Sequence, residues 1–575
     1  MVSNKGHALR NGGQRSTSPN TEAQETKREQ IRDFIQELTV DLSELETFYN
    51  VKLSQSRIER IAEYVTNKFM ELVQGFSSTF DELDQQSQVE YLLCFNYLRR
   101  KTEVLRADWF KLEELEPLLR GWASGLVELC ERRQKVVPTT GQDAAKVLSE
   151  ASKGIDGLSV RIQEGKFSMK SRFAPYRAAE QIEQLHGLLK EWYGFYEGYD
   201  PLFTWWTTKP WSDLSAKLQD LVPLIREKLV GIKPGEDDAI VGQPIGRDEI
   251  DNELKAEMIP YTPEELIQIA EREYAWCEKE AIKAAQEMGL GKNWRKALEH
   301  VKNMYVEPGQ QTYMVHELAQ EAIDYVTKHD MVTVPQIAKE CWRTYMIPPS
   351  QQKVSPFFLG GPYIQVSYPT NTMTHDEKLM VMRGNSKPLS RSTVFHELIP
   401  GHHLQYHYMP RSKPHRRLFE TPFWIEGWAF YWEMILWDRG FPGTPENRIG
   451  MLFWRMHRCA RIVFSLRFHL GEMTPGECIE YLVEKVGHER ATAEGEVRRS
   501  FNGDYGALYQ AGYMIGALQM YALRKEVVGA GKMTEKAFHD RVLRENTMPI
   551  EMVRALIKGE KLEAFYTPRW RFYDL

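Results

Sequence analysis

The chain lacks the features that would tie it to a membrane, to an oxidising compartment or to a polynucleotide. It contains no run of about 18 uncharged apolar residues, the length that a membrane-spanning helix requires. Residues 1–28 are polar and carry no apolar segment, so we expect a disordered tail and not a secretory signal. The six cysteines form no Cys-x-x-Cys pair, which indicates reduced thiols, and the net charge of −6 disfavours nucleic acid as a partner. We therefore expect a soluble, cytoplasmic protein with no membrane or nucleic-acid partner.

Two common hydrolase signatures are missing as well. No Gly-x-Ser-x-Gly nucleophile elbow occurs, which disfavours a serine peptidase. The zinc-binding pattern His-Glu-x-x-His begins at His396 and Glu397, but its second histidine position is Pro400, which cannot bind a metal. The strict motif is therefore absent, and a metal site at this position needs a different geometry.

A dense group of potential metal ligands nevertheless surrounds this position. His396, Glu397, His402 and His403 fall close together in an otherwise apolar stretch. On a regular helix, His402 would point about 240° away from His396, and His403 would lie roughly 10 Å further along the axis. Pro400 and the glycine after it favour a local bulge, which would turn His402 back towards His396. We predict a metal site with His396 and His402 as ligands, and with His403 as the alternative to His402.

A third ligand is expected further along the chain, because a catalytic zinc normally has three protein ligands and one open position. Glu426 lies in an apolar, aromatic segment, where a free carboxylate would be costly and metal binding removes that cost. Its alternative is an ion pair with a later arginine. Glu433, one heptad beyond Glu426, is better placed to orient a ligand histidine. Glu397 is left as the general base that takes a proton from metal-activated water.

Stabilisation of an oxyanion has several candidates. Glycine breaks and three tyrosines occur together at residues 503–513, where a phenol of Tyr509 or Tyr513 would serve this role. His469 is a further candidate, at the end of an apolar helical segment that begins near Asn447. We expect the arginines of that segment to bind carboxylates of the protein or of a substrate terminus: Arg455, Arg458, Arg461 and Arg467. Helix packing is the alternative for the tyrosines.

Apolar residues recur at helical spacing through most of the chain, which predicts a mainly α fold. Residues 231–247 interrupt the pattern with prolines and glycines and mark a boundary between lobes. Helices are expected to begin after Thr262 and Thr474, each followed by a proline and then a glutamate at the third helical position. The predicted organisation is a disordered tail at 1–28, an N-terminal helical lobe at 29–230, a linker at 231–247 and a C-terminal catalytic lobe at 248–575.

One segment has the character of a strand. Residues 357–368 are β-prone, and the last five alternate between apolar and polar side chains. We expect a small sheet beside the active-site helix, with Gly360 and Gly361 allowing close backbone approach and an edge on which a peptide could dock. A purely structural strand is the alternative. The predicted fold is two helical lobes around a deep cleft, with this small sheet beside the site.

The stretch His396–Gln405, followed by Glu426–Ala429 and Glu433, resembles the uncharacterised-protein family numbered 885, which is placed with the gluzincin metallopeptidases. The similarity continues through Tyr509–Gly516 and includes the segment around Glu265, so it covers most of the chain beyond the tail.

This resemblance implies a fold and a set of ligands. Related thimet-oligopeptidase-like enzymes carry His-Glu-x-Gly-His in a mainly helical, two-lobed structure around a long cleft. The present motif is similar, with two residues inserted before the Gly-His pair. The comparison implies His396, His402 and Glu426 as zinc ligands and Glu397 as the base.

The expected function is zinc-dependent hydrolysis of peptide bonds in short peptides. Glu397 would activate the attacking water and then pass the proton to the leaving amine. Zinc is the expected metal, with another divalent ion as the alternative. Two rival interpretations are a metal-dependent amidase or hydrolase of a small metabolite, and a helical binding protein without catalysis.

Overall fold

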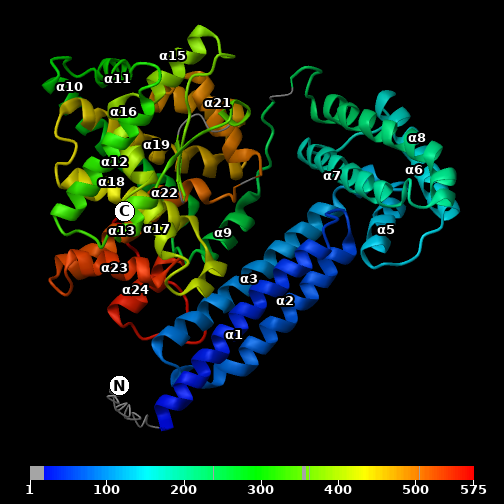
Figure 1. The fold of residues 1–575 in the computed structure, drawn as a ribbon, viewed down its shortest axis with the longest axis horizontal. Helices are drawn as coiled ribbons and strands as arrows, with labels where there is room; N and C mark the ends of the chain where they lie inside the picture. The colour runs from blue at the N-terminus through cyan, green and yellow to red at the C-terminus, as the bar shows by residue number, and fades with distance from the viewer. Residues whose placement is uncertain (1–18, 237–238, 353–357, 362, 504) are drawn as a thin grey trace, which may run out of the picture.

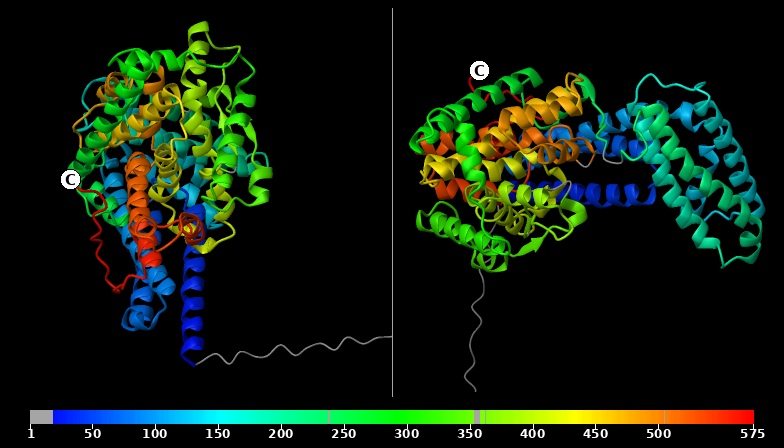
Figure 2. Two further views of the ribbon diagram at one scale, coloured as in Figure 1. Left: turned by 90° about the vertical axis from the view of Figure 1, so that its left-hand side faces the viewer. Right: turned by 90° about the horizontal axis from the view of Figure 1, so that it is seen from above.

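The computed structural model describes residues 19–236, 239–352, 358–361, 363–503 and 505–575. This part of the chain is mainly α-helical, as predicted, and its sheet is small. Long N-terminal helices cross the molecule, a helical bundle lies at one end of them, and a larger helical body lies along the other (Figure 1 and Figure 2). Among the described helices, none is both long and apolar enough to cross a membrane.

The first eight α-helices form the long helices and the bundle. Polar side chains cap several of them. Ser54 accepts a hydrogen bond from the Arg57 N–H at the start of α2, and Asp84 accepts one from the Ser87 N–H at the start of α3. The elements are α1 (Pro19–Phe48), α2 (Gln55–Phe76), η1 (Ser77–Glu82), α3 (Gln85–Glu113), α4 (Glu116–Leu119), α5 (Ala123–Gln134), α6 (Gly141–Gln163), α7 (Phe173–Tyr196), α8 (Pro201–Ile225) and η2 (Arg226–Val230).

The remaining helices form the body, which contains the histidine stretch. The predicted capping boxes at Thr262 and Thr474 are confirmed, since each threonine and the glutamate three residues later exchange side-chain-to-backbone hydrogen bonds. The first of these helices are α9 (Gly246–Ala256), α10 (Pro263–Glu287), α11 (Trp294–Lys302), α12 (Gln311–Lys328), α13 (Gln336–Cys341), α14 (Pro349–Gln352), α15 (His375–Gly384), α16 (Lys387–Glu397) and α17 (His402–Tyr408). They are followed by η3 (Pro414–Phe419), α18 (Pro422–Asp438), α19 (Pro445–His469), α20 (Pro475–Tyr481), η4 (Leu482–Val486), α21 (Arg490–Phe501), α22 (Tyr509–Arg524), η5 (Lys525–Gly529), α23 (Glu535–Glu545) and α24 (Ile550–Lys558).

The small sheet lies beside α16, as predicted. β1 (Thr344–Met346) pairs in parallel with β3 (Ile364–Val366), and β2 (Phe358–Leu359) pairs antiparallel with the other edge of β3. The ends of β3 are buried and its centre is less so, which matches the predicted alternation. β2 packs against α16 and brings the following glycine close to the histidine stretch. Residues 357 and 362 of the predicted strand lie outside the described residues.

The main hydrophobic core contains residues from both sides of the linker predicted at residues 231–247. Apolar side chains of α1 to α3 share one buried cluster with helices from α9 to α24. Phe95 of α3 packs against Phe565, with ring centres 5.8 Å apart, and Gln85 donates a hydrogen bond to the Ala555 carbonyl (3.0 Å). The bundle of α5 to α8 has a separate core. In the described chain the largest of four buried clusters therefore contains residues from both sides of the predicted linker, and the bundle has a cluster of its own.

The last ten residues of the predicted disordered tail, 19–28, are helical in the structure. Residues 1–18 lie outside the described residues, whereas residues 19–28 form the first turns of α1. The Arg28 guanidinium pairs with Asp84 of α3 at 2.6 Å, and this contact fixes the start of the helix against its neighbour. The polar composition of residues 19–28 predicted disorder. The prediction failed because their partner, Asp84, lies far away in the sequence and no local pattern indicates the contact.

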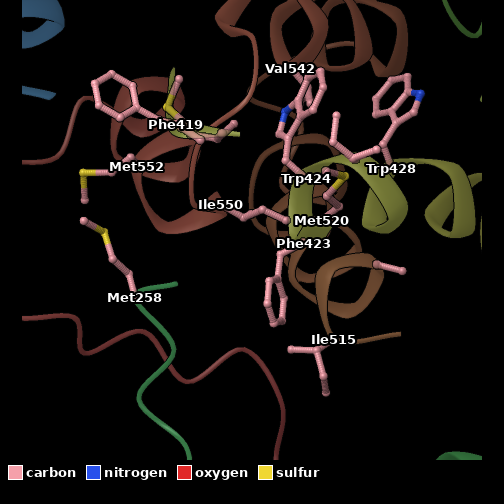
Figure 3. Close-up of a cluster of buried hydrophobic side chains, with 14 of the residues drawn as sticks. Met258, Phe419, Phe423, Trp424, Trp428, Ile515, Met520, Val542, Ile550 and Met552 are labelled. Carbon is pink, nitrogen blue, oxygen red and sulfur yellow. The ribbon is translucent and has the colours of Figure 1, made fainter. Parts of the chain in front are cut away.

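α18 and α22 pack backbone against backbone in the centre of the body. A Cβ at Gly427 of α18 would collide with the backbone of Gly516 of α22, so only glycine allows the helices to approach this closely. Apolar side chains surround the contact. Figure 3 shows Trp424 and Trp428 on one side of α18 and Phe423 on the other. This packing places polar side chains of α22 next to those of α18.

Candidate metal centre

The helix that carries His396 ends directly after it. α16 stops at Glu397 and α17 begins at His402, so residues 398–401 form a complete break where the sequence predicted only a bulge. The imidazole rings of His396 and His402 are consequently neighbours, with centres 4.9 Å apart and planes nearly perpendicular. The break between the two helices therefore places the two histidines side by side.

Specific contacts hold this break in position. The Pro400 carbonyl accepts a hydrogen bond from the Trp428 indole (2.8 Å), and the Gly401 N–H donates to the Phe395 carbonyl (3.0 Å). Gly401 also packs so tightly on the end of α16 that a Cβ there would collide with the His396 carbonyl oxygen. Proline and glycine thus each have a defined structural role in the motif.

His396, His402 and Glu426 form a buried group of potential metal ligands. The Nε2 atoms of His396 and His402 lie 3.5 and 3.1 Å from Glu426 Oε2, and the three ligand atoms all lie within 4.8 Å of one another. Tetrahedral ligands at the usual zinc distances of 2.0–2.2 Å are separated by roughly 3.3–3.6 Å, so the group fits a zinc ion with one open position. In the described part of the chain, no other group of His, Cys, Asp and Glu has this arrangement.

Both histidines are oriented by hydrogen bonds at their other ring nitrogen. His396 Nδ1 lies 2.8 Å from Glu433 Oε1, and His402 Nδ1 lies 3.0 Å from Gln405 Oε1. The Gln405 amide is itself fixed, because its Nε2 donates to the Trp424 carbonyl (3.1 Å). These contacts direct both Nε2 atoms towards Glu426, which is the arrangement of histidines that bind metals. Glu433 therefore has the orienting position that the heptad spacing indicated.

Two tyrosines of α22 complete this side of the site. The Tyr509 hydroxyl donates a hydrogen bond to Glu426 Oε1, and the Tyr513 ring stacks on His396 with centres 6.1 Å apart. Burial raises the pKa of both phenols, and the nearby Glu426 carboxylate adds to the effect. Both tyrosines are thus neutral hydrogen-bond donors near neutral pH.

The charges of the site favour a bound cation. Burial acts to lower the pKa of His396, but hydrogen bonds to Glu426 and Glu433 outweigh it and raise the pKa to about 9. Burial acts to raise the pKa of Glu426, but the neighbouring His402 and His396 hold it well below its usual range. The same carboxylates that attract a proton to His396 would stabilise a metal ion.

A cavity of about 250 Å³ opens onto the three potential metal ligands, and Glu397 lines it beside them. Burial raises the pKa of Glu397, although the charges of His396 and His402 act in the opposite direction. Gly360, next to β2, lies so close to the Glu397 carboxylate that a Cβ would collide with it. The glycine predicted to allow close approach therefore does so directly at the candidate base.

Two predicted histidines are directed elsewhere. His403 lies on α17 with its Nε2 2.9 Å from the Ala338 carbonyl, so it does not join His396 and Glu426. His469, predicted as an oxyanion stabiliser, lies outside the described lining of the cavity and packs against Phe501. Burial lowers the pKa of His469 to about 4. Its position at the far end of α19 removes it from the group of catalytic candidates.

The arginines of α19 divide between structural pairs and the cavity. Arg455 pairs with Glu273 (2.8 Å) and Arg467 with Glu271 (3.3 Å), both on α10. Arg458 lines the cavity instead, on the face of α19 that is turned towards α22. Arg455 and Arg467 therefore pair with protein carboxylates, whereas Arg458 is placed to contact a ligand in the cavity.

Several cavity residues were not singled out in the sequence. Tyr406 lies one turn after His402 on the same helix, and this spacing was a usable signal. Arg499 and Tyr505 reach the cavity from α21 and the segment after it, and only tertiary packing brings them there. The cavity lining also includes Gln365, Thr393, Ile425 and Trp454, together with Gly360, Gly361 and Arg461, which were singled out in the sequence.

Comparisons with known proteins agree with this fold. Residues 7–557 match the family described as "Bacterial protein of unknown function (DUF885)". A "putative lipoprotein of unknown function" from Shewanella oneidensis has a similar structure, with a TM-score of 0.65, 18% identity, and coverage of 92% of this chain and 99% of that one. A "putative lipoprotein" from Colwellia psychrerythraea matches with a TM-score of 0.56, 16% identity, and coverage of 93% and 99%. No curated protein sequence matches the chain.

Proposed function

The chain belongs to the DUF885 family of bacterial proteins of unknown function, and we propose that it is a zinc-dependent hydrolase that cleaves peptide bonds of short peptides. The observation that carries this proposal is the buried group of His396, His402 and Glu426, with Glu397 beside it in a cavity. Two histidines and one glutamate are the ligands of catalytic zinc in several peptidases. The same set supports the placement with the gluzincin metallopeptidases that the sequence resemblance suggests.

The residues around the ligands supply the remaining parts of a hydrolytic site. A zinc ion, when bound, polarises a substrate carbonyl and lowers the pKa of water towards neutrality. Glu397 takes the proton of the attacking water, and its raised pKa suits a base that must later return the proton to the leaving amine. Tyr513 is the better donor to an oxyanion, because the Tyr509 hydroxyl is already donated to Glu426.

The cavity suits a small part of a substrate. A cavity of about 250 Å³ is near the lower end of the usual size of small-ligand sites, which supports small substrates such as short peptides. A metal-dependent hydrolase of a small amide metabolite would use the same groups. A panel of short peptides and small amides distinguishes these two activities.

The test combines metal content with hydrolysis. Purified protein supplied with zinc is expected to hold about one ion per chain and to cleave short peptides. The Glu397→Gln variant is expected to keep its zinc and to lose about 10²–10⁴-fold in rate, because a positioned general base contributes this much. Glu472→Gln, at an exposed position of the body, is the matched control. An unchanged rate in Glu397→Gln, or a wild type that binds no zinc, would contradict the proposal.

A further inference from the structure

Three arginines form a cationic wall of the cavity, here called the arginine cluster: Arg458 and Arg461 of α19 and Arg499 of α21. Arg458 and Arg461 are only 4% and 3% exposed. Burial lowers the pKa of Arg458, but a guanidinium stays charged at neutral pH. Three cations therefore line one small cavity.

Nearby carboxylates do not fully compensate these charges. Arg461 Nε donates to Glu496 at 2.7 Å. The carboxylate oxygen nearest to Arg458 is Glu433 Oε1 at 3.7 Å, which is beyond hydrogen-bond length, and Arg458 Nε has no partner among the described residues. Burying a cation without a hydrogen-bonded anion is costly, so the cluster is suited to receive an anion from outside.

Arg499 is the least engaged member. Its guanidinium lies over the Tyr505 ring, 5.0 Å from the ring centre, and its Nε has no hydrogen-bond partner in the described part of the chain. Burial acts to lower the pKa of Arg499, but Tyr513, the Glu496 carboxylate, Tyr505 and Tyr509 raise it well above its usual range, so the guanidinium stays charged beside the phenols that border the ligand group. Arg499 is therefore available to a ligand at the wall next to the candidate zinc site.

Tyr513 connects the arginine cluster with the metal ligands. Its ring centre lies 5.1 Å from Arg458 Cζ and 4.4 Å from Arg461 Cζ, and the ring stacks on His396. One residue of extended chain spans about 3.3–3.6 Å. An anion held at the cluster thus lies at most about three residues of extended chain away from a peptide bond at the ligands and Glu397.

We propose that the arginine cluster binds the C-terminal carboxylate of a peptide substrate, so that the enzyme removes residues from the C-terminus. This rests on the proposed function. Guanidinium groups bind carboxylates through paired, charge-assisted hydrogen bonds. An acidic side chain offers the same chemistry, but the chain terminus is the carboxylate that every short peptide carries close to its last peptide bond.

Binding to the Glu397→Gln protein tests the cluster without turnover. The probes are acetyl-Ala-Ala-Ala, its C-terminal amide, and acetyl-Ala-Ala-Glu amide, measured by titration calorimetry. The free acid is expected to bind about 10–100-fold more tightly than the amide, since hydrogen bonds to charged groups have this strength. Equal affinity of acid and amide would overturn the proposal. Affinity of the glutamate amide equal to that of the free acid would assign the cluster to an acidic side chain and overturn the terminal assignment.

Two substitutions test whether the arginine cluster causes the preference for the free acid. Arg499→Met is the primary substitution, because the Nε of Arg499 has no hydrogen-bond partner among the described residues, whereas Arg461 is hydrogen-bonded to Glu496 and that pair stays in place. It is expected to remove most of the preference for the free acid, with an unchanged circular dichroism spectrum. Arg498→Met, one residue earlier and outside the described cavity lining, is the control and is expected to keep the preference. A preference that survives in Arg499→Met would overturn the role of this residue.

Hydrolysis by the wild type separates this inference from the proposed function. Cleavage of the free acid with little cleavage of the amide supports both. Equal cleavage of the two peptides supports the proposed hydrolase function and overturns the proposal that the arginine cluster binds the terminal carboxylate. Absence of cleavage with zinc bound contradicts the proposed function, while the calorimetric preference still decides the assignment of the cluster.

Discussion

His396 Nδ1 lies 2.8 Å from Glu433 Oε1, and this contact joins α16 to the aromatic helix α18. It fixes the ring so that Nε2 faces Glu426. We predict that Glu433→Gln lowers zinc affinity by about 10-fold or more, because carboxylates that orient ligand histidines contribute this much. Competition with a chelator measures the change, with Glu472→Gln as the control. An unchanged zinc affinity would show that the orientation does not depend on the charge of Glu433.

The two adjacent histidines of the motif are predicted to behave differently. His402→Ala removes one of the three ligand atoms and is expected to lose the zinc. His403→Ala is expected to keep it, because His403 Nε2 faces the Ala338 carbonyl. Elemental analysis of the two purified variants decides between them. Loss of metal in His403→Ala alone would exchange their roles.

The contact between α18 and α22 predicts sensitivity at a glycine far from the histidine stretch. A Cβ at Gly516 would collide with the Phe423 carbonyl, so Gly516→Ala must push the helices apart. We expect a loss of about 1–3 kcal/mol in the free energy of unfolding, as for other overpacked interiors. Gly157→Ala, in open space on α6, is the control and is expected to be neutral or stabilising. A thermal unfolding scan that ranks the two variants equally would contradict this account of the contact.

A buried ion cluster between α3 and η3 predicts the response to acid. Glu90 accepts hydrogen bonds from Arg416 (2.8 Å), and His415 Nε2 lies at the same distance. Burial acts to raise the pKa of Glu90, but these two partners lower it to about 2 from an ordinary value of 4.5. Stabilisation by ionised Glu90 is therefore complete above about pH 4.5 and is lost as the pH falls towards 2.

The variant Glu90→Gln isolates this contribution. At neutral pH it is expected to lower the free energy of unfolding by on the order of 3 kcal/mol, the equivalent of the pKa shift. The difference from wild type is expected to shrink between about pH 4.5 and pH 2, because the wild-type carboxylate is protonated there. Unfolding temperatures measured across this range check the sign. A constant difference at all pH values would rule out the titration of Glu90 as the cause.

Local sequence patterns predicted the helices and the candidate ligands well. The capping boxes at Thr262 and Thr474 are local hydrogen-bond patterns, so the sequence alone predicts them. The sequence also singled out His396, His402 and Glu426, because burying imidazole and carboxylate groups in an apolar segment is costly unless they bind a metal or a charged partner. Their role as zinc ligands stays a prediction until metal is measured.

Features that depend on distant parts of the chain were not predictable. Residues 19–28 become helical through contacts such as Arg28 with Asp84, which no local pattern indicates. Arg499 reaches the cavity only because α21 packs there, and its own neighbours in sequence resemble any polar helix. His469 lies on the same helix as Arg458, but it is eleven residues further along α19 and is not part of the described cavity lining.

The core shared by α1 to α3 with the last helices also sets the order of events during synthesis. Helices α1 to α3 leave the ribosome well before their apolar partners near Ala555 and Phe565, because more than 400 residues separate them. The bundle of α5 to α8 has its own core and can fold in the interval. The nascent chain therefore exposes the apolar faces of α1 to α3 until these later partners have been made, a state in which unfolded chains associate.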